Sequence, residues 1–253
     1  MYEFLSSTSN NALVTQLSRN DRRHVSAIPL ELADMADVGS DFRHLHGEIA
    51  SVGNQLLKRA EHLSDQGFNS EAAGLVDRII RPAYKLAVEG VRRTTAEIDK
   101  KAEQWFTPDF GPDSDPATRA VQHTWWRGLS MPQQLEAAQQ DLAIARVAVG
   151  FGQAASTLPP DVFDRLRRDM AVEQLAQRIA SDTNMLTAPT PTDPIGGLVD
   201  LATARANAAE AFSRWDSERE LLASAPALLT SIIDTAAVLT GENRTQAFER
   251  LTA

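Results

Sequence analysis

Two of the chain's five histidines lie one residue apart in the segment DFRHLHGEI, residues 41–49. The carboxylates of Asp41 and Glu48 flank them, and imidazole and carboxylate groups are common metal ligands. His44 and His46 would share a face on a β-strand, where alternate side chains point the same way. On a helix they point about 200° apart and cannot hold one ion. The backbone that carries this segment therefore decides its chemistry.

The apolar residues around the histidines predict a helix. Their spacing alternates between three and four residues, which draws an apolar stripe along one side of a long helix. The stripe consists of Met35, Val38, Phe42, Leu45, Ile49, Val52, Leu56 and Leu63. His44 and His46 then flank Leu45, and only Asp41, His44 and Glu48 could share a face. A di-iron bundle would repeat a Glu-x-x-His motif on several helices, and no such motif recurs. We therefore predict surface residues and no metal site.

Motifs of the familiar catalytic classes are missing from the sequence. It has no G-x-S-x-G, no P-loop, no dinucleotide-binding glycine motif and no H-E-x-x-H. Without cysteine there is no thiolate nucleophile, disulfide or cysteine-bound zinc. The net charge of -9 argues against general binding to the DNA backbone, which needs a basic surface. We expect a protein that is not an enzyme and has no catalytic residues and no cofactor.

The composition favours helices. Hydrophobic residues make up 43% of the chain, many of them alanine, and aromatic residues make up 6%. Alanine is the best helix former and a poor strand former, and Val, Ile and Thr do not gather into alternating runs. We predict an all-α fold, with a long antiparallel helical hairpin plus additional helical bundle segments.

Polar and proline-rich stretches divide the chain into five predicted segments. These are a polar N-terminal arm (1–29) with a short helix around 12–17, a long helical hairpin (30–106), a central helical segment (107–186), a Pro/Thr linker (187–194) and a C-terminal helical unit (195–253). The hairpin is expected to turn at 66–69, with Ser70 as the next N-cap. Pro82 should kink or interrupt its second helix, because proline lacks an N–H group and clashes with the preceding turn. Gly241, Asn243 and Gln246 predict a helix end followed by a capping box.

Two clusters are candidates for contact with partners. In HTWWRG, residues 123–128, the adjacent Trp125 and Trp126 point about 100° apart on a helix, so one should pack in the core and the other at an edge or interface. Interface cores are enriched in Trp and Arg, and Arg127 follows directly. In RNDRRH, residues 19–24, the arginines could contact an acidic partner: Arg19, Arg22 and Arg23.

The leading hypothesis is a non-catalytic structural or scaffolding helical protein, a subunit of a larger assembly, with a bacteriophage virion component as one concrete form. Protein partners or self-association are expected. One alternative is a nucleic-acid-associated regulatory protein that uses its basic N-terminal arm. A less favoured one is a helical-bundle metalloenzyme that uses Asp41, His44 and Glu48. The apolar stretches look too short for a membrane span, and no signal peptide pattern is visible. The expected location is the cytoplasm or a virus particle within a bacterial host.

Overall fold

The computed structural model describes residues 2–9, 11–111, 114–183 and 200–253. The chain divides into two compact units: unit 1 comprises Met1–Glu97 and Ser217–Ala253, and unit 2 comprises Ile98–Asp216. The boundaries fall inside two long helices, α4 (Arg81–Phe106) and α9 (Leu201–Ala223). The fold is largely helical, which confirms the predicted class, but it also contains a small sheet.

Residues 2–29 form a three-stranded antiparallel sheet, and the predicted polar arm is wrong. Strands β1 (Tyr2–Thr8), β2 (Ala12–Arg19) and β3 (Arg22–Pro29) lie in the order β1-β2-β3. The short helix predicted around 12–17 is wrong too, because β2 covers those residues. Asn20 and Asp21 join β2 to β3 with φ angles of 46° and 65°. A two-residue turn with both φ angles positive matches the twist of a β-hairpin.

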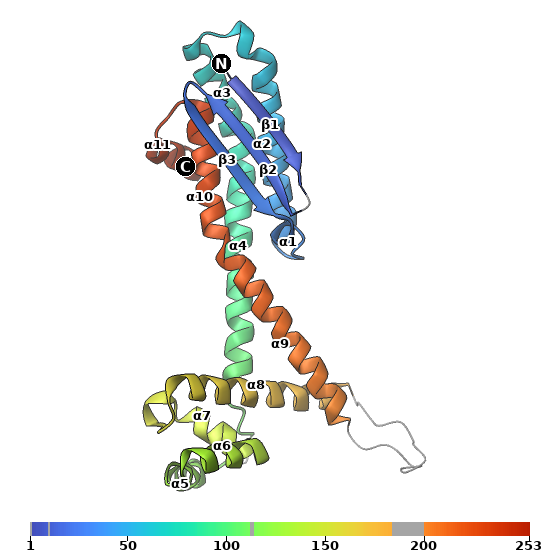
Figure 1. The fold of residues 1–253 in the computed structure, drawn as a ribbon, viewed down its shortest axis with the longest axis vertical. Coiled ribbons are helices and arrows are strands. Elements are labelled where there is room, and N and C mark those ends of the chain that lie inside the picture. Colours follow the sequence, from blue (N-terminus) through green and yellow to red (C-terminus); the bar gives the residue numbers. More distant parts are fainter. Residues whose placement is uncertain (1, 10, 112–113, 184–199) are drawn as a thin grey trace, which may run out of the picture. The chain divides into compact units, whose positions relative to one another are not determined.

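Helices of unit 1 cover one face of this sheet (Figure 1). Unit 1 contains α1 (Leu30–Ala33), α2 (Gly39–Arg59), α3 (Asp65–Leu75), the first part of α4, α10 (Ala225–Thr240) and α11 (Arg244–Thr252), and of these α1, α2 and α10 contact the sheet. α2 contacts β1 and β2, and α10 contacts β2 and β3. The predicted stripe faces inward in the same chain, and its central members are fully buried: Phe42, Leu45, Ile49, Val52 and Leu56. Burial of this stripe removes the apolar side of α2 from water and so stabilises unit 1.

The predicted hairpin turn lies a few residues too late in the sequence. α2 ends at Arg59, a short 3-10 turn spans Ala60–His62, and Ser64 caps α3 by accepting a hydrogen bond from the Gly67 amide at 3.2 Å. Ser70 is therefore not an N-cap but lies inside α3. A π-helical turn, Val76–Ile80, separates α3 from α4 just before Pro82. Such widened turns accommodate a residue that cannot donate its own backbone hydrogen bond, so the predicted interruption is confirmed.

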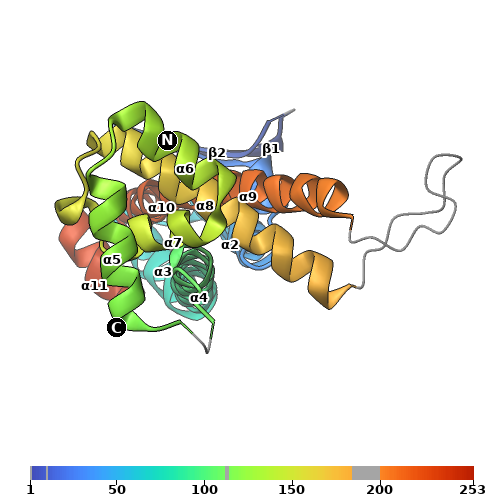
Figure 2. The same ribbon diagram turned by 90° about the horizontal axis from the view of Figure 1, so that it is seen from below.

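The regular secondary structure among the described residues of unit 2 is all helical. It contains α5 (Pro116–Arg127), α6 (Met131–Gln140), α7 (Leu142–Gly150), a 3-10 turn (Gln153–Ala155), α8 (Pro160–Asp182) and the ends of α4 and α9. α7 contacts α5, α6 and α8 (Figure 2). Four aromatic rings from α4 and α9 pack together: Trp105, Phe106, Phe212 and Trp215. The predicted linker at 187–194 lies outside the described residues.

The C-terminal capping signals are confirmed. Gly241 ends α10 with a left-handed φ of 76°. The Asn243 side chain accepts from the Gln246 amide at 2.9 Å, and the Gln246 side chain accepts from the Asn243 amide at 3.1 Å. This reciprocal pair is the predicted capping box at the start of α11.

One apolar helical stretch is longer than the sequence suggested. Among the described residues, Leu201–Thr240 is long and apolar enough to cross a membrane by length and composition, and its most apolar 18-residue window has a mean hydropathy of 1.6 and is 39% buried. α10 supplies part of this stretch and packs against β3, α3 and α11. Its Leu229, Ile232 and Leu239 are buried in unit 1, so the fold itself uses this apolar character.

Candidate protein interaction surface

The two histidines of the opening segment point away from each other. His44 Nδ1 lies 3.8 Å from Glu48 Oε1 on the exposed side of α2, and His46 Nε2 lies 3.4 Å from Ser6 Oγ of β1. Burial beside the sheet lowers the pKa of His46. Asp41 lies 3.9 Å from Arg93 Nη2. Among the described residues, no group of three or more His, Asp or Glu side chains is arranged to hold a metal ion.

The three arginines of the second cluster do not form one basic patch. Arg19 is buried, donates from Nη1 to the Leu239 carbonyl at 3.0 Å and lies over the Phe68 ring at 4.1 Å. Burial lowers the pKa of Arg19. Arg22 Nη1 donates to the Glu242 carbonyl at 3.1 Å. Both cations thus bind carbonyls at or just beyond the C-terminal end of α10, where the helix dipole favours positive charge.

Arg23 lies on the other face of the sheet. It is paired in register with Ser18 of β2, whereas Arg19 and the buried Leu17 point to the opposite, helix-covered side. Arg22 and Arg23 are both exposed, but only Arg23 has no hydrogen-bond or ion-pair partner in the described part of the chain.

The adjacent tryptophans divide as predicted. Trp126 is fully buried, and its Nε1 donates to the Gln134 carbonyl at 3.0 Å while the Gln134 side chain donates to the Trp126 carbonyl at 3.1 Å. Trp125 is 53% exposed, and Arg127 is exposed beside it. The prediction that one tryptophan packs in the core is confirmed. A partner for Trp125 and Arg127 stays a prediction.

The main surface that the sequence did not reveal is the outer face of the sheet, here called the open face. No described helix or strand covers it. It consists of Glu3, Leu5 and Ser7 from β1, Val14, Gln16 and Ser18 from β2, and Arg23, Val25 and Ala27 from β3. Two apolar side chains stand out on it, with Leu5 56% and Val25 51% exposed. Of these residues, sequence reasoning named Arg23 alone.

Contacts on the covered side hold β1 in place and so orient the open face. Tyr2 donates from its hydroxyl to the Gly53 carbonyl of α2 at 3.4 Å, and its ring lies 5.0 Å from that of Phe68. Phe4 and Ser6 face α2 as well. Because side chains alternate along a strand, Glu3, Leu5 and Ser7 must face outward.

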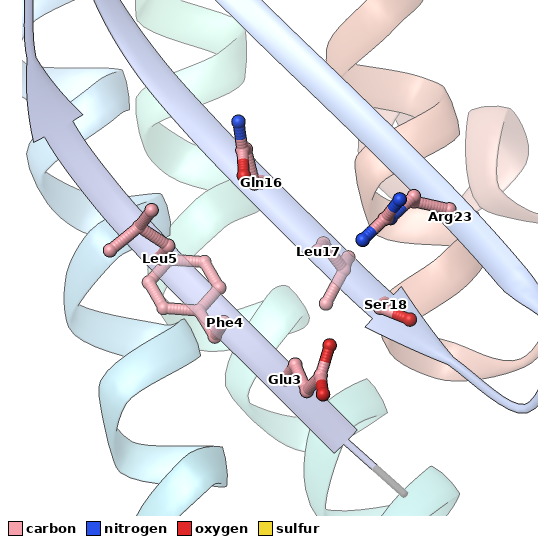
Figure 3. Close-up of a pocket in the computed structure, with 7 residues that line it drawn as sticks. All are labelled: Glu3, Phe4, Leu5, Gln16, Leu17, Ser18 and Arg23. Atoms are coloured by element: carbon pink, nitrogen blue, oxygen red, sulfur yellow. The ribbon is translucent and has the colours of Figure 1, made fainter.

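A shallow hollow of about 230 Å³ lies on the open face (Figure 3). Its lining includes Glu3, Leu5, Gln16, Ser18 and Arg23. Neither the Glu3 carboxylate nor the Arg23 guanidinium forms an ion pair with another described residue. The surface thus combines exposed apolar side chains with one acidic and one basic group that have no partner in the described part of the chain.

β1 also has a free edge. It pairs with β2 alone in the sheet that the structure describes, so the backbone groups on its other side have no strand partner there. Free edges of this kind can pair with another chain and are usually blunted by charge, proline or a covering element. β1 has no proline and one charged residue, Glu3. Together, the fold and this surface define a largely helical protein with a small sheet that is open on one face.

No protein-family model, curated protein or solved structure matches this chain.

Proposed function

We propose that this chain is a non-catalytic structural subunit of a larger protein assembly and that it joins the assembly through the open face of its sheet. One observation carries the proposal. Leu5 and Val25, both more than half exposed, lie in the same row of a sheet whose other face packs against α2 and α10. An exposed apolar sheet face beside a free strand edge promotes uncontrolled association unless a specific partner covers it.

The distribution of charged groups supports a non-catalytic role. Active sites gather titratable side chains in a cleft and perturb their pKa values together. In the described residues the perturbed acids serve local structure instead. Asp115 has a lowered pKa because it caps α5 through Thr118, and Glu242 has a lowered pKa because Arg250 binds it. Asp109 has a lowered pKa because it accepts from the Gly111 amide and from Arg178.

A bacteriophage virion component is one concrete form of this proposal. Long helices, an interaction surface and no recognisable catalytic motif suit a particle subunit. The nucleic-acid alternative has less support, because Arg19 and Arg22 are engaged with the end of α10 and Arg23 faces the other way.

The test is the mass of the purified protein, measured by light scattering after gel filtration. The proposal predicts a mass above the 27.6 kDa of one chain or a protein that co-purifies in a fixed ratio. A monomer without a partner at every concentration would contradict it. Nucleic acid that co-purifies at low salt and is removed by high salt would instead favour the regulatory alternative.

A further inference from the structure

The register of the strands arranges the open face in three rows. Glu3, Ser18 and Arg23 form the first row, in which the acid lies on one edge strand and the base on the other. Neighbouring strands are about 4.8 Å apart, so the backbones that carry these two charges are separated by roughly 10 Å across β2. Neither charge forms an ion pair with another residue of the described chain.

The other two rows are mostly apolar at the sheet edges. Leu5, Gln16 and Val25 form the second row, in which an amide lies between two apolar side chains. The third row consists of Ser7, Val14 and Ala27. The three rows therefore differ in their side chains: the first has opposite charges at its ends, the second has apolar ends around an amide, and the third has small or apolar side chains. They follow one another along the strands.

One two-fold arrangement of two copies brings the open faces together with matching side chains. A two-fold axis that runs parallel to the strands, between two facing sheets, exchanges the edge strands and keeps each row at its own height. β1 of one copy then lies over β3 of the other. Glu3 meets Arg23 of the second copy, and the symmetry makes the same ion pair twice. Leu5 meets Val25 of the second copy twice, and Gln16 meets its own counterpart.

Other arrangements leave the charges without partners. A two-fold axis perpendicular to the strands would place Glu3 opposite Ser7 and Arg23 opposite Ala27. Antiparallel pairing of two β1 edges around Leu5 would place Glu3 beside Ser7. Closed dimers with two-fold symmetry are the commonest assemblies of identical chains, and their interfaces must be self-complementary. Of these three arrangements, the parallel axis alone pairs both charges.

We propose that the open face binds a second copy of this chain, face to face, with Glu3 paired with Arg23 across the interface. The inference rests on the proposed function and names the partner. Packed sheets lie about 10 Å apart and align to within about 30°, which lets facing side chains meet. Three strands of about seven residues present roughly 300 Å², less than the ~800 Å² per partner of a standard interface. The dimer should therefore be weak and depend on concentration.

Charge reversal tests the pairing. Glu3→Arg and Arg23→Glu should each weaken self-association by roughly tenfold, because both cross-interface pairs become like-charged. An equimolar mixture of these two variants should associate as wild type does, since every pair between them is then opposite in charge. The double variant Glu3→Arg/Arg23→Glu should also self-associate as wild type does, because its two cross-interface pairs are again opposite in charge. Sedimentation velocity over a concentration series measures these changes, and unchanged thermal unfolding of each variant confirms that it is folded.

Cysteine cross-linking tests the geometry, and the absence of native cysteine makes the readout clean. The proposal predicts that a mixture of Leu5→Cys and Val25→Cys chains forms a cross-linked dimer with a short bismaleimide, whereas each variant alone does not. Cross-linking of Leu5→Cys with itself would overturn the proposal in favour of edge pairing. If the protein assembles and its assembled mass is the same in wild type and in the charge-reversal variants, this inference is overturned while the proposed function stands. A partnerless monomer at all concentrations would overturn both.

Discussion

Phe4 of β1 lies directly against Gly53 of α2, so closely that a Cβ atom at position 53 would come within 2.3 Å of the Phe4 ring. The close approach of the sheet to α2 at this point therefore depends on the missing side chain. Tyr2 reaches the carbonyl of the same glycine, so two inward residues of β1 meet α2 at one position. This contact fixes which side chains of β1 face outward.

Gly53→Ala should destabilise unit 1 by about 1–3 kcal/mol, because overpacking at Phe4 outweighs the gain of about 1 kcal/mol in helix propensity. Gly47→Ala is the matched control. It lies in the same helix, it is exposed, and a Cβ there would meet nothing within 4 Å. It should stabilise the protein by roughly 0.5–1 kcal/mol. Urea unfolding followed by circular dichroism measures both, and equal stabilisation by the two variants would contradict the packing described here.

The adjacent tryptophans should respond very differently to truncation. Trp126→Ala removes a fully buried ring and the hydrogen bond to the Gln134 carbonyl, so a loss of about 3–5 kcal/mol is expected. Trp125→Ala removes a ring that is 53% exposed and should change stability by less than about 1 kcal/mol. Thermal unfolding distinguishes the two. A comparable loss in both variants would mean that Trp125 is covered by another chain.

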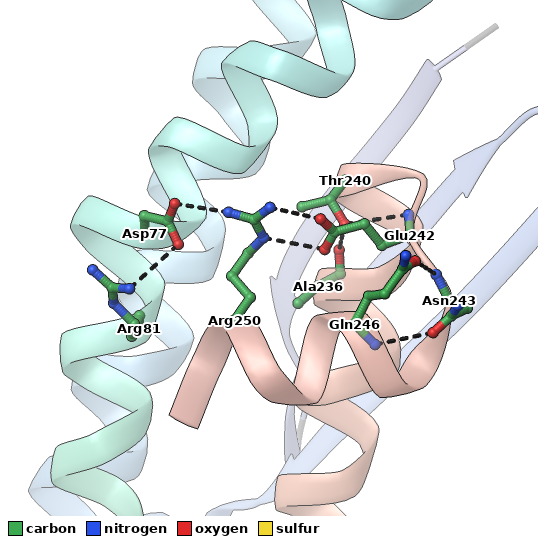
Figure 4. A network of polar contacts seen from close by, with 8 residues as sticks. All are labelled: Asp77, Arg81, Ala236, Thr240, Glu242, Asn243, Gln246 and Arg250. Carbon is green, nitrogen blue, oxygen red and sulfur yellow. Dashed lines mark hydrogen bonds and ion pairs between the residues drawn. The ribbon is translucent and has the colours of Figure 1, made fainter. Parts of the chain in front are cut away.

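Arg250 of α11 links two acids in unit 1 (Figure 4). Its guanidinium donates to both carboxylate oxygens of Glu242, at 2.6 and 3.1 Å, and to Asp77 at 2.7 Å. All three side chains are partly buried. Charge-assisted contacts of this geometry are stronger than ordinary surface ion pairs. Glu242→Gln should therefore cost about 1 kcal/mol at pH 7.

The same pair predicts how stability depends on pH. The hydrogen bonds from Arg250 hold the pKa of Glu242 below its ordinary value of 4.5. The unfolded chain therefore takes up this proton first, so the contribution of Glu242 is complete above the ordinary value and is lost as the pH falls through the lowered pKa. Wild type should lose more stability than Glu242→Gln between pH 7 and about pH 3. Glu249→Gln, an exposed position on α11 beside Arg250, should follow wild type in urea unfolding at each pH.

Local patterns predicted the helices well and the sheet not at all. The three-four spacing from Phe42 to Leu56 placed α2, and Asn243 with Gln246 placed the start of α11. Residues 2–29 lack the regular alternation of polar and apolar residues that marks a half-buried strand. The polar Thr15 and Arg19 point inward, whereas the apolar Leu5 and Val25 point outward. The two-residue Asn20-Asp21 turn was the local signal that was available.

Distant contacts explain why the sheet was hidden. Arg19 is stabilised by the Leu239 carbonyl, 220 positions away, and β3 packs on α10 from the other end of the chain. A sequence read in short windows cannot show such partners, so a buried arginine looks like part of a basic tail. The open face was missed for the same reason, because its outward residues are recognised only once the inward ones have found α2 and α10.

The claim that the chain assembles through the open face is tested most directly by sedimentation equilibrium of two leucine-to-lysine variants. Leu5 on the open face and Leu86 on α4 are exposed to similar extents, 56% and 53%. Lysine at an open sheet edge blocks pairing with other chains and is a good helix former. Leu5→Lys should reduce the assembled mass to the 27.6 kDa of one chain, and Leu86→Lys should leave it unchanged. If Leu5→Lys stays assembled while Leu86→Lys dissociates, the open face is not the interface.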